Sequence, residues 1–261
     1  MKVVILCGGY GTRIRDVDHD LPKPMIPIGG YPIIWHIMKY YASFGHDEFI
    51  LCLGYKGNVI KDYFLNYESR VTDFSITLGK KDSMKILSNH TEQNWKITFA
   101  ETGLDSMTGT RIKKIQKYIK PKESFMLTYG DGLSNINIDQ LISFHKSHGK
   151  SLTLSGVKPA GRFGEIMSNS KGAITEFKEK PESTDARING GFFVANYSLF
   201  DFIDYERDDV VFEQEPMNEL VKQKQLMQFD HNGFWQPMDT MREYKMLNKL
   251  FNENKAEWKI W

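Results

Sequence analysis

The sequence predicts an α/β fold with a doubly wound, mostly parallel Rossmann-like sheet to which antiparallel strands are added. Short, continuous apolar runs recur along the chain, as expected of strands that are covered on both faces. Segments with apolar residues at helical spacing alternate with these runs. The length of 261 residues fits one large domain or two small ones. Because no shift in composition divides the chain, we expect a single domain over residues 1–261.

Strand and helix signals alternate from the start of the chain. The apolar run Val3–Cys7 ends at two glycines, and residues 32–44 then place apolar side chains at helical spacing. Further strands are expected over residues 48–53, 124–129 and 151–157, and further helices over residues 56–67 and 138–147. This alternation is typical of parallel strands joined by crossover helices.

Two stretches, near residues 71–100 and 162–196, depart from that alternation. They hold short apolar runs with no good helix between them, namely Phe74–Leu78, Lys96–Ala100, Ile174–Lys178 and Phe192–Ala195. We interpret these stretches as strand-rich insertions that add antiparallel strands to the domain.

Two helical patterns close the chain, at residues 213–224 and 240–252. The second begins at Thr240 with Glu243 three residues later, which is a capping-box arrangement.

Charge and composition exclude several classes of function. The chain has 34 Lys and Arg against 33 Asp and Glu, a net charge of +1 that argues against a nucleic-acid partner. The first apolar run is too short for a secretory signal, and no run of about 18 apolar residues could span a membrane. We therefore expect a cytoplasmic protein without a membrane partner. Cys7 and Cys52 lie in apolar runs, which favours buried, reduced thiols.

A glycine-rich loop, residues 8–13 (Gly-Gly-Tyr-Gly-Thr-Arg), follows the first expected strand directly. Backbone N–H groups in such a loop can approach a phosphate closely. Ile14 stands where the Rossmann fingerprint needs a third glycine, and the P-loop pattern is not met either. A tight turn without a ligand is the alternative. Lys23, between Pro22 and Pro24, is a stiffly presented cation suited to a phosphate, and a solvated loop lysine is its alternative.

The glycine loop together with Pro22–Met25 resembles the signature of the sugar-1-phosphate nucleotidylyltransferases. Further motifs resemble one branch, the glucose-1-phosphate cytidylyltransferases, across almost the whole chain; they lie at residues 29–38, 54–57, 106–109, 128–132, 189–193 and 233–240. The resemblance implies a fold of the nucleotide-diphospho-sugar transferase type.

The resemblance also implies the roles of individual residues. Arg13 and Lys23 are expected to be catalytic. The nucleotide site is expected to comprise Leu6, Gly8, Gly9, Gly11, Thr12, Arg13, Ser106, Arg111 and Gly130. Thr110 stands where the branch usually has a second glycine, so the backbone around the base is expected to differ here. Arg111 lies on the opening turn of an expected helix that runs to Tyr118, where N–H groups and the helix dipole favour an anion or a nucleotide carbonyl.

Two isolated aspartates match the family's metal-binding positions. Asp131 follows an apolar run at the carboxyl edge of the expected sheet, and Asp239 precedes an expected helix. Taken alone, they could be an Asp-Gly turn and a helix cap. Mg²⁺ needs one or two carboxylates, with waters and phosphate oxygens completing its shell, so the resemblance implies Mg²⁺ as the cofactor.

Three residues match the sugar side of the site. The resemblance assigns Glu179 to sugar hydroxyls and Lys180 to the sugar phosphate, and Gly190 would let the sugar approach the backbone. Without the family, Glu179 and Lys180 could belong to a solvated edge strand. Both could face one site only if regular pleating ends at Pro181.

The implied reaction is attack by a sugar-phosphate oxygen on the α-phosphorus of a nucleoside triphosphate, with release of pyrophosphate. By resemblance the substrates are CTP and α-D-glucose 1-phosphate, and CDP-glucose would serve deoxysugar and O-antigen-type polysaccharide synthesis. Alternatives are the same chemistry with UTP, dTTP, GTP or another sugar phosphate, and a non-catalytic sugar-nucleotide sensor. The resemblance and the aromatic tail Trp258–Trp261 predict a homo-oligomer.

Overall fold

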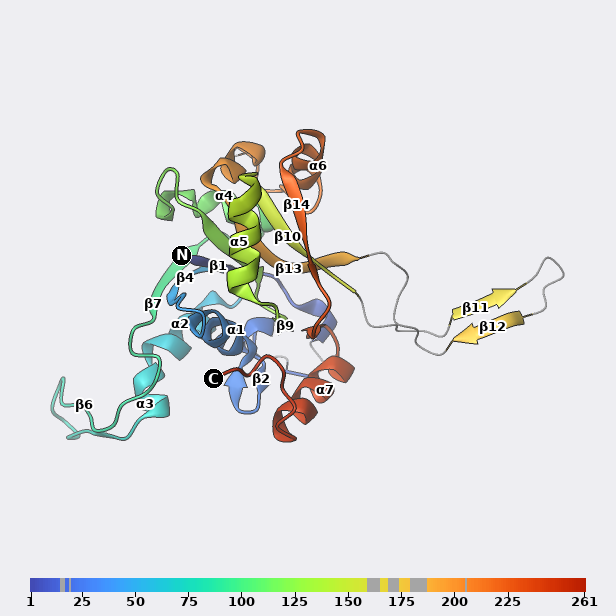
Figure 1. Ribbon diagram of the computed structural model, residues 1–261. Coiled ribbons are helices and arrows are strands. Elements are labelled where there is room, and N and C mark those ends of the chain that lie inside the picture. Colours follow the sequence, from blue (N-terminus) through green and yellow to red (C-terminus); the bar gives the residue numbers. More distant parts are fainter. Residues whose placement is uncertain (15–16, 19, 159–164, 169–173, 179–186, 205) are drawn as a thin grey trace.

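A seven-stranded sheet forms the centre of the molecule (Figure 1). The computed structural model describes residues 1–14, 17–18, 20–158, 165–168, 174–178, 187–204 and 206–261. In spatial order the strands are β14 (Leu226–His231), β10 (Leu152–Val157), β13 (Ile188–Ala195), β8 (Phe125–Tyr129), β1 (Val3–Leu6), β4 (Glu48–Leu53) and β7 (Lys96–Glu101). In this sheet β13 runs antiparallel to both of its neighbours, and the remaining pairs are parallel. The prediction of a mostly parallel α/β sheet is confirmed.

Helices cover both faces of the sheet. One face carries α1 (Ile33–Ala42), α2 (Gly57–Leu65) and α5 (Ile138–His148), and the other carries α4 (Thr108–Lys114), a 3₁₀ helix (Tyr197–Phe202) and α6 (Glu215–Lys222). Successive residues of β1 alternate between the two sides: Val3 and Ile5 join one apolar core, whereas Val4 and Leu6 join the other. This double burial explains why the strand is continuously apolar.

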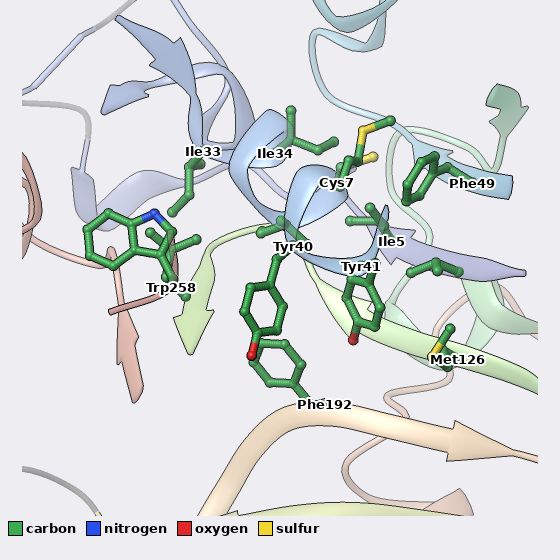
Figure 2. Close-up of a cluster of buried hydrophobic side chains, with 14 of the residues drawn as sticks. Ile5, Cys7, Ile33, Ile34, Tyr40, Tyr41, Phe49, Met126, Phe192 and Trp258 are labelled. Atoms are coloured by element: carbon green, nitrogen blue, oxygen red, sulfur yellow. The ribbon is translucent and has the colours of Figure 1, made fainter. Parts of the chain in front are cut away.

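The larger core lies between the sheet and α1 (Figure 2). Ile5 and Met126 rise from neighbouring strands, and Tyr41 of α1 stacks with Phe192 of β13 at a centroid distance of 6.0 Å. Trp258, in the segment after α7 (Met241–Asn252), is fully buried in this core. At least one tryptophan of the aromatic tail is therefore a packing residue of the chain itself.

Two expectations about the strands need correction or extension. Residues 96–100, expected to be an antiparallel addition, belong to β7, which pairs in parallel with β4 as the edge of the central sheet. The chain can return in this direction because α2 and α3 (Tyr67–Val71) intervene between β4 and β7. The edge strand β14 was not predicted; it is only partly buried, so its side chains lack a continuous apolar run.

The other added strands are antiparallel, as expected. β5 (Phe74–Ser75) pairs with β6 (Lys85–Ile86), and β11 (Glu165–Ser168) pairs with β12 (Ile174–Lys178). The expected capping box is confirmed as well: the Thr240 side chain accepts from the Glu243 backbone, and the Glu243 side chain reaches back to Thr240. Within the described ranges, no helix is both long and apolar enough to cross a membrane.

The connections place a switch point at β1. The chain leaves β1 for β4 on one side, and β8 joins from the other side, so the loops after these strands open a crevice at their carboxyl ends. Beside it, two short strands pair: β9 (Gly132–Ser134), just after β8, and β15 (Trp235–Pro237), just before α7. This pairing brings segments that are a hundred residues apart to one edge of the crevice.

Candidate active site

A cavity of about 550 Å³ lies at the carboxyl ends of β1 and β8. Ten of the residues singled out from the sequence line it, namely Leu6, Gly8, Gly9, Gly11, Thr12, Lys23, Ser106, Arg111, Gly130 and Asp131. They come from three separate parts of the chain. The sheet collects them because parallel strands end at the same edge.

The glycine loop forms one wall of the cavity and is packed too tightly for side chains at two positions. A Cβ on Gly8 would collide with the guanidinium of Arg111 and would lie 2.9 Å from the backbone nitrogen of Gly54. Gly11 has a φ of +59°, and a Cβ there would lie 3.0 Å from the Cβ of Lys23. Glycine is therefore required for close packing at Gly8 and for a left-handed turn at Gly11.

Lys23 forms the centre of a charge cluster at one end of the cavity. It opens a 3₁₀ helix (Lys23–Met25), and its Nζ lies 2.5 Å from Asp131 Oδ2 and 2.6 Å from Asp239 Oδ1. The Lys23 side chain is 10 % exposed. Burial disfavours its charged form, but the two carboxylates outweigh that effect, so the pKa of Lys23 lies above its ordinary value.

The two aspartates are brought together by backbone pairing. The Met238 N–H donates to the Asp131 carbonyl at 2.9 Å, next to the β9–β15 ladder, and the Asp239 N–H donates to Glu243 Oε2 at 2.7 Å. Both carboxylates converge on one cation, the Lys23 ammonium. This donor set fits a divalent ion such as Mg²⁺, which takes one or two protein carboxylates and fills its other positions with water and phosphate oxygens.

Arg111 also lines the cavity and is 5 % exposed. Its two terminal nitrogens donate to four carbonyls and one hydroxyl, all neutral; the acceptors are Leu53 O, Gly103 O, Gly8 O, Leu104 O and Thr102 Oγ1, at 2.7–3.1 Å. Burial lowers the pKa of Arg111. The guanidinium thus ties the last residue of β4 to the loops that follow β1 and β7.

The first turn of α4, which carries Arg111, is covered by another segment of the chain. The N–H groups of Gly109 and Thr110 both donate to Val210 O, at 2.8 and 3.3 Å. The Thr110 hydroxyl donates to Arg207 O at 3.0 Å and accepts from Val210 N. The amides of Gly109 and Thr110, which we expected to favour an anion, therefore bind the 207–212 segment, and the expected helix to Tyr118 is α4 followed by a short 3₁₀ helix.

Comparison with known proteins identifies the family. The family of nucleotidyl transferases matches residues 2–253. The chain belongs to this family. The glucose-1-phosphate cytidylyltransferase of Salmonella typhimurium is 47 % identical over the full length of both chains, and the probable glucose-1-phosphate cytidylyltransferase of Bacillus subtilis is 45 % identical, also over the full length of both. The crystal structure of HddC from Yersinia pseudotuberculosis complexed with GMP-PN has a TM-score of 0.67 at 25 % identity, covering 96 % of this chain and 99 % of that one.

Membership of the family makes the protein a nucleotidyltransferase. The substrates of a sugar-phosphate nucleotidyltransferase are a nucleoside triphosphate and a sugar 1-phosphate, and the family generally uses a divalent metal ion. The cavity has the groups that such a reaction needs, because the glycine loop, Lys23 and Asp131 line it and Asp239 pairs with Lys23.

Three of the expected site residues lie wholly or partly outside the described structure. Glu179 and Lys180 fall outside the described residues. Arg13 lies in a short 3₁₀ helix (Thr12–Ile14), and its side chain is likewise outside the description.

Gly190 is described, in β13, and does not line the cavity. A Cβ there would meet Val157 and Ser155 of the adjacent strand, and its carbonyl accepts from Trp235 Nε1 at 2.7 Å. Close packing of β13 against β10 therefore requires glycine at this position.

Sequence reasoning missed a polar bridge between two residues that line the cavity, Tyr129 and Thr108. The Tyr129 hydroxyl donates to Glu213, whose other oxygen accepts from Thr108 Oγ1 at 2.7 Å, and Asn189 Nδ2 donates to the same tyrosine at 3.2 Å. Burial, followed by the charge of Glu213, raises the pKa of Tyr129. Tyr129 and Asn189 stand inside recognised motifs, which was a usable signal. Glu213 had none, because the fold alone brings it beside Thr108.

The two thiols are buried, as expected. Cys7 and Cys52 are free, and Cys7 Sγ donates to the Cys52 carbonyl at 3.3 Å. Burial raises the pKa of Cys52 to about 12, so neither a disulfide nor a thiolate nucleophile is indicated, although Cys7 lines the cavity.

Proposed function

We propose that the protein transfers a cytidylyl group from CTP to α-D-glucose 1-phosphate, forming CDP-glucose and pyrophosphate in a Mg²⁺-dependent reaction. Full-length identities of 47 % and 45 % to glucose-1-phosphate cytidylyltransferases support these substrates. The observation that carries the chemistry is the convergence of Lys23, Asp131 and Asp239 beside the glycine loop. By the same analogy, CDP-glucose would feed deoxysugar and O-antigen-type polysaccharide synthesis.

The sugar phosphate is already an anionic nucleophile, so no side-chain nucleophile is required. Asp131 and Asp239 would hold Mg²⁺, which when bound neutralises phosphate charge. Lys23 and Arg13 would stabilise the negative charge that develops during transfer. The glycine loop would present its amides to the triphosphate, and Leu6, Ser106 and Gly130 would border the nucleotide.

The sugar is proposed to bind beyond Asp131, toward β13. Glu179 would bind sugar hydroxyls and Lys180 the sugar phosphate, by resemblance. Asn189 supports this location, because it is hydrogen-bonded to Tyr129, which lines the cavity. Since the described structure explains Gly190 by strand packing, the sugar contact of its backbone stays a prediction.

A panel of nucleotides and sugar 1-phosphates tests the proposal. Purified protein is incubated with Mg²⁺, one of CTP, UTP, dTTP, GTP or ATP, and one of glucose, mannose or galactose 1-phosphate, and pyrophosphate release is measured. CTP with glucose 1-phosphate is expected to give the highest kcat/KM. Faster turnover with another pair would correct the substrates, and no turnover with any pair would reject transfer altogether and favour a sugar-nucleotide sensor.

We also propose that the protein self-associates. Six large apolar side chains are exposed on the segment around β5 and β6, namely Phe74, Ile76, Leu78, Met84, Ile86 and Leu87. Figure 1 shows this segment extending away from the sheet. An exposed apolar surface of this kind is typical of contacts between subunits. Light scattering is expected to give a mass above 30.3 kDa, and a monomer at micromolar concentration would reject the proposal.

A cytoplasmic location is proposed on chemical grounds. Both cysteines are free and buried, as suits a reducing compartment, and nucleoside triphosphates are cytoplasmic substrates. Fractionation of cells expressing the protein would test this location.

A further inference from the structure

We propose that the Lys23 ammonium is an internal counter-cation that a divalent metal must displace, so that one lysine couples metal binding to triphosphate binding. The inference rests on the proposed function, which assigns Asp131 and Asp239 as metal ligands. It goes beyond that function because it concerns the order and strength of binding.

The backbone at both aspartates is held by contacts that do not involve Lys23. One backbone hydrogen bond joins residue 131 to residue 238, and the adjacent β9–β15 ladder pairs Gly132 with Pro237. The capping box at the start of α7 holds the backbone on the other side of Asp239. The fold therefore keeps two negative charges close together. Like charges that are close together repel each other, and a cation between them offsets this repulsion.

One cation position serves both carboxylates. The Lys23 nitrogen lies 2.5 Å from one carboxylate oxygen and 2.6 Å from the other. Mg²⁺ would contact the same oxygens at about 2.0–2.1 Å. An ammonium and a metal ion cannot occupy this position together, because the two cations repel each other at such short range. Entry of the metal therefore expels the ammonium.

The expelled ammonium has one evident place to go. Lys23 lines the cavity, and its backbone is held by the flanking Pro22 and Pro24 and by close contact with Gly11, so only the flexible end of the side chain can move. In the cavity it lies beside the glycine loop, where a triphosphate is proposed to bind. A phosphate would then replace the carboxylates as its partner.

The displacement of Lys23 by a metal ion changes the charge balance of the site, and this affects how tightly the metal binds. Among the described residues, the Lys23 ammonium pairs with both Asp131 and Asp239. A divalent ion neutralises the pair but leaves the ammonium unpaired, unless an anion is bound in the cavity. Metal binding should thus be weak in the free protein and stronger with triphosphate, and the coupling is reciprocal.

Direct metal binding to the full chain, without nucleotide, tests the proposal. Mn²⁺ binding is measured by electron paramagnetic resonance for the wild type and for Lys23→Met, whose side chain has similar length and no charge. We expect the variant to bind Mn²⁺ at least about tenfold more tightly. Equal or weaker binding by the folded variant would overturn the proposal. Lys23→Gln serves as the second variant if Lys23→Met does not fold.

Two further variants separate failure of this inference from failure of the proposed function. Adding Asp131→Asn to Lys23→Met should abolish tight Mn²⁺ binding; if tight binding persists, the metal lies elsewhere and the metal assignment itself is wrong. Lys2→Met removes a lysine paired with Glu123 at 3.2 Å, near the start of β1, and should bind Mn²⁺ as the wild type does. If Lys2→Met tightened binding equally, the effect would reflect overall charge and would overturn the role of Lys23.

Discussion

Two cations that line the cavity, Lys23 and Arg111, have opposite kinds of partner. Lys23 is paired with two carboxylates, whereas Arg111 donates to neutral carbonyls and one hydroxyl. A charge–charge contact can be exchanged for another charged partner, such as a metal or phosphate. Arg111 cannot exchange its partners in this way. If it moved, the acceptors of its five hydrogen bonds would lose their donor, and the segments that carry them would no longer be held together. Lys23 is suited to chemistry, and Arg111 to holding the site in shape.

Removing the carboxylates should have the largest effect on activity. Asp131→Asn and Asp239→Asn are each expected to lower kcat by about 10³-fold or more, because a neutral amide cannot hold the proposed metal. For Asp131→Asn the free energy of unfolding should change by less than about 1 kcal/mol, since Asp131 is partly exposed. Pyrophosphate release and urea denaturation are the measurements. Normal turnover in either variant would remove that residue from the metal site.

Arg111 should behave in the opposite way. Arg111→Met leaves several buried carbonyls without donors and is expected to lower the free energy of unfolding by about 3 kcal/mol. Lys23→Met should lower activity by about 100-fold, because the ammonium would no longer stabilise the charge that develops during transfer. Urea denaturation of Arg111→Met and pyrophosphate release by Lys23→Met are the measurements. If Arg111→Met were as stable as the wild type, the anchoring role would be wrong and a direct nucleotide contact would be favoured.

Thr110, which replaces the usual glycine of the branch, lies next to Arg111 in the first turn of α4. Thr110→Val keeps the shape but loses the hydrogen bonds to Arg207 O and Val210 N, and should cost about 1 kcal/mol of unfolding free energy. The KM for CTP is expected to rise a few-fold, because the cavity wall formed by residues 106–108 precedes this turn. Steady-state kinetics with Thr175→Val as an exposed control would check this prediction, and unchanged values in both assays would contradict it.

The smallest expected effect is the pH dependence of the contribution that Lys23 makes to the free energy of unfolding. Because the folded-state pKa of Lys23 is raised above 10.5, its pairing should stabilise the fold fully below that pH and lose this contribution only as pH rises through the higher folded value. The stability difference between the wild type and Lys23→Met should therefore stay constant from about pH 7 to 9.5. Urea denaturation at three pH values tests this. A difference that rises with pH within this range would mean that folding lowers the pKa of Lys23 rather than raising it.

The sequence was enough to predict a mostly parallel sheet, most of its helices and the cavity wall at the glycine loop. Continuous apolar runs report burial on both faces, and a loop after a buried strand must lie at the edge of the sheet. Asp131 was placed at that edge by the same reasoning. The direction of β7 and the presence of β14 were not predictable, because pairing direction and edge position depend on connections over long distances.

Only the tertiary structure decided which partners Lys23 and Arg111 have. Lys23 lies between two prolines and Arg111 on a helix turn, but neither local setting shows which partners the cation meets. Their partners come from residues 131 and 239 in one case, and from residues 8, 53 and 102–104 in the other. An ion pair or a buried hydrogen-bond network is formed by groups that are distant along the chain, so the fold, rather than the neighbouring sequence, sets the charge that each cation meets.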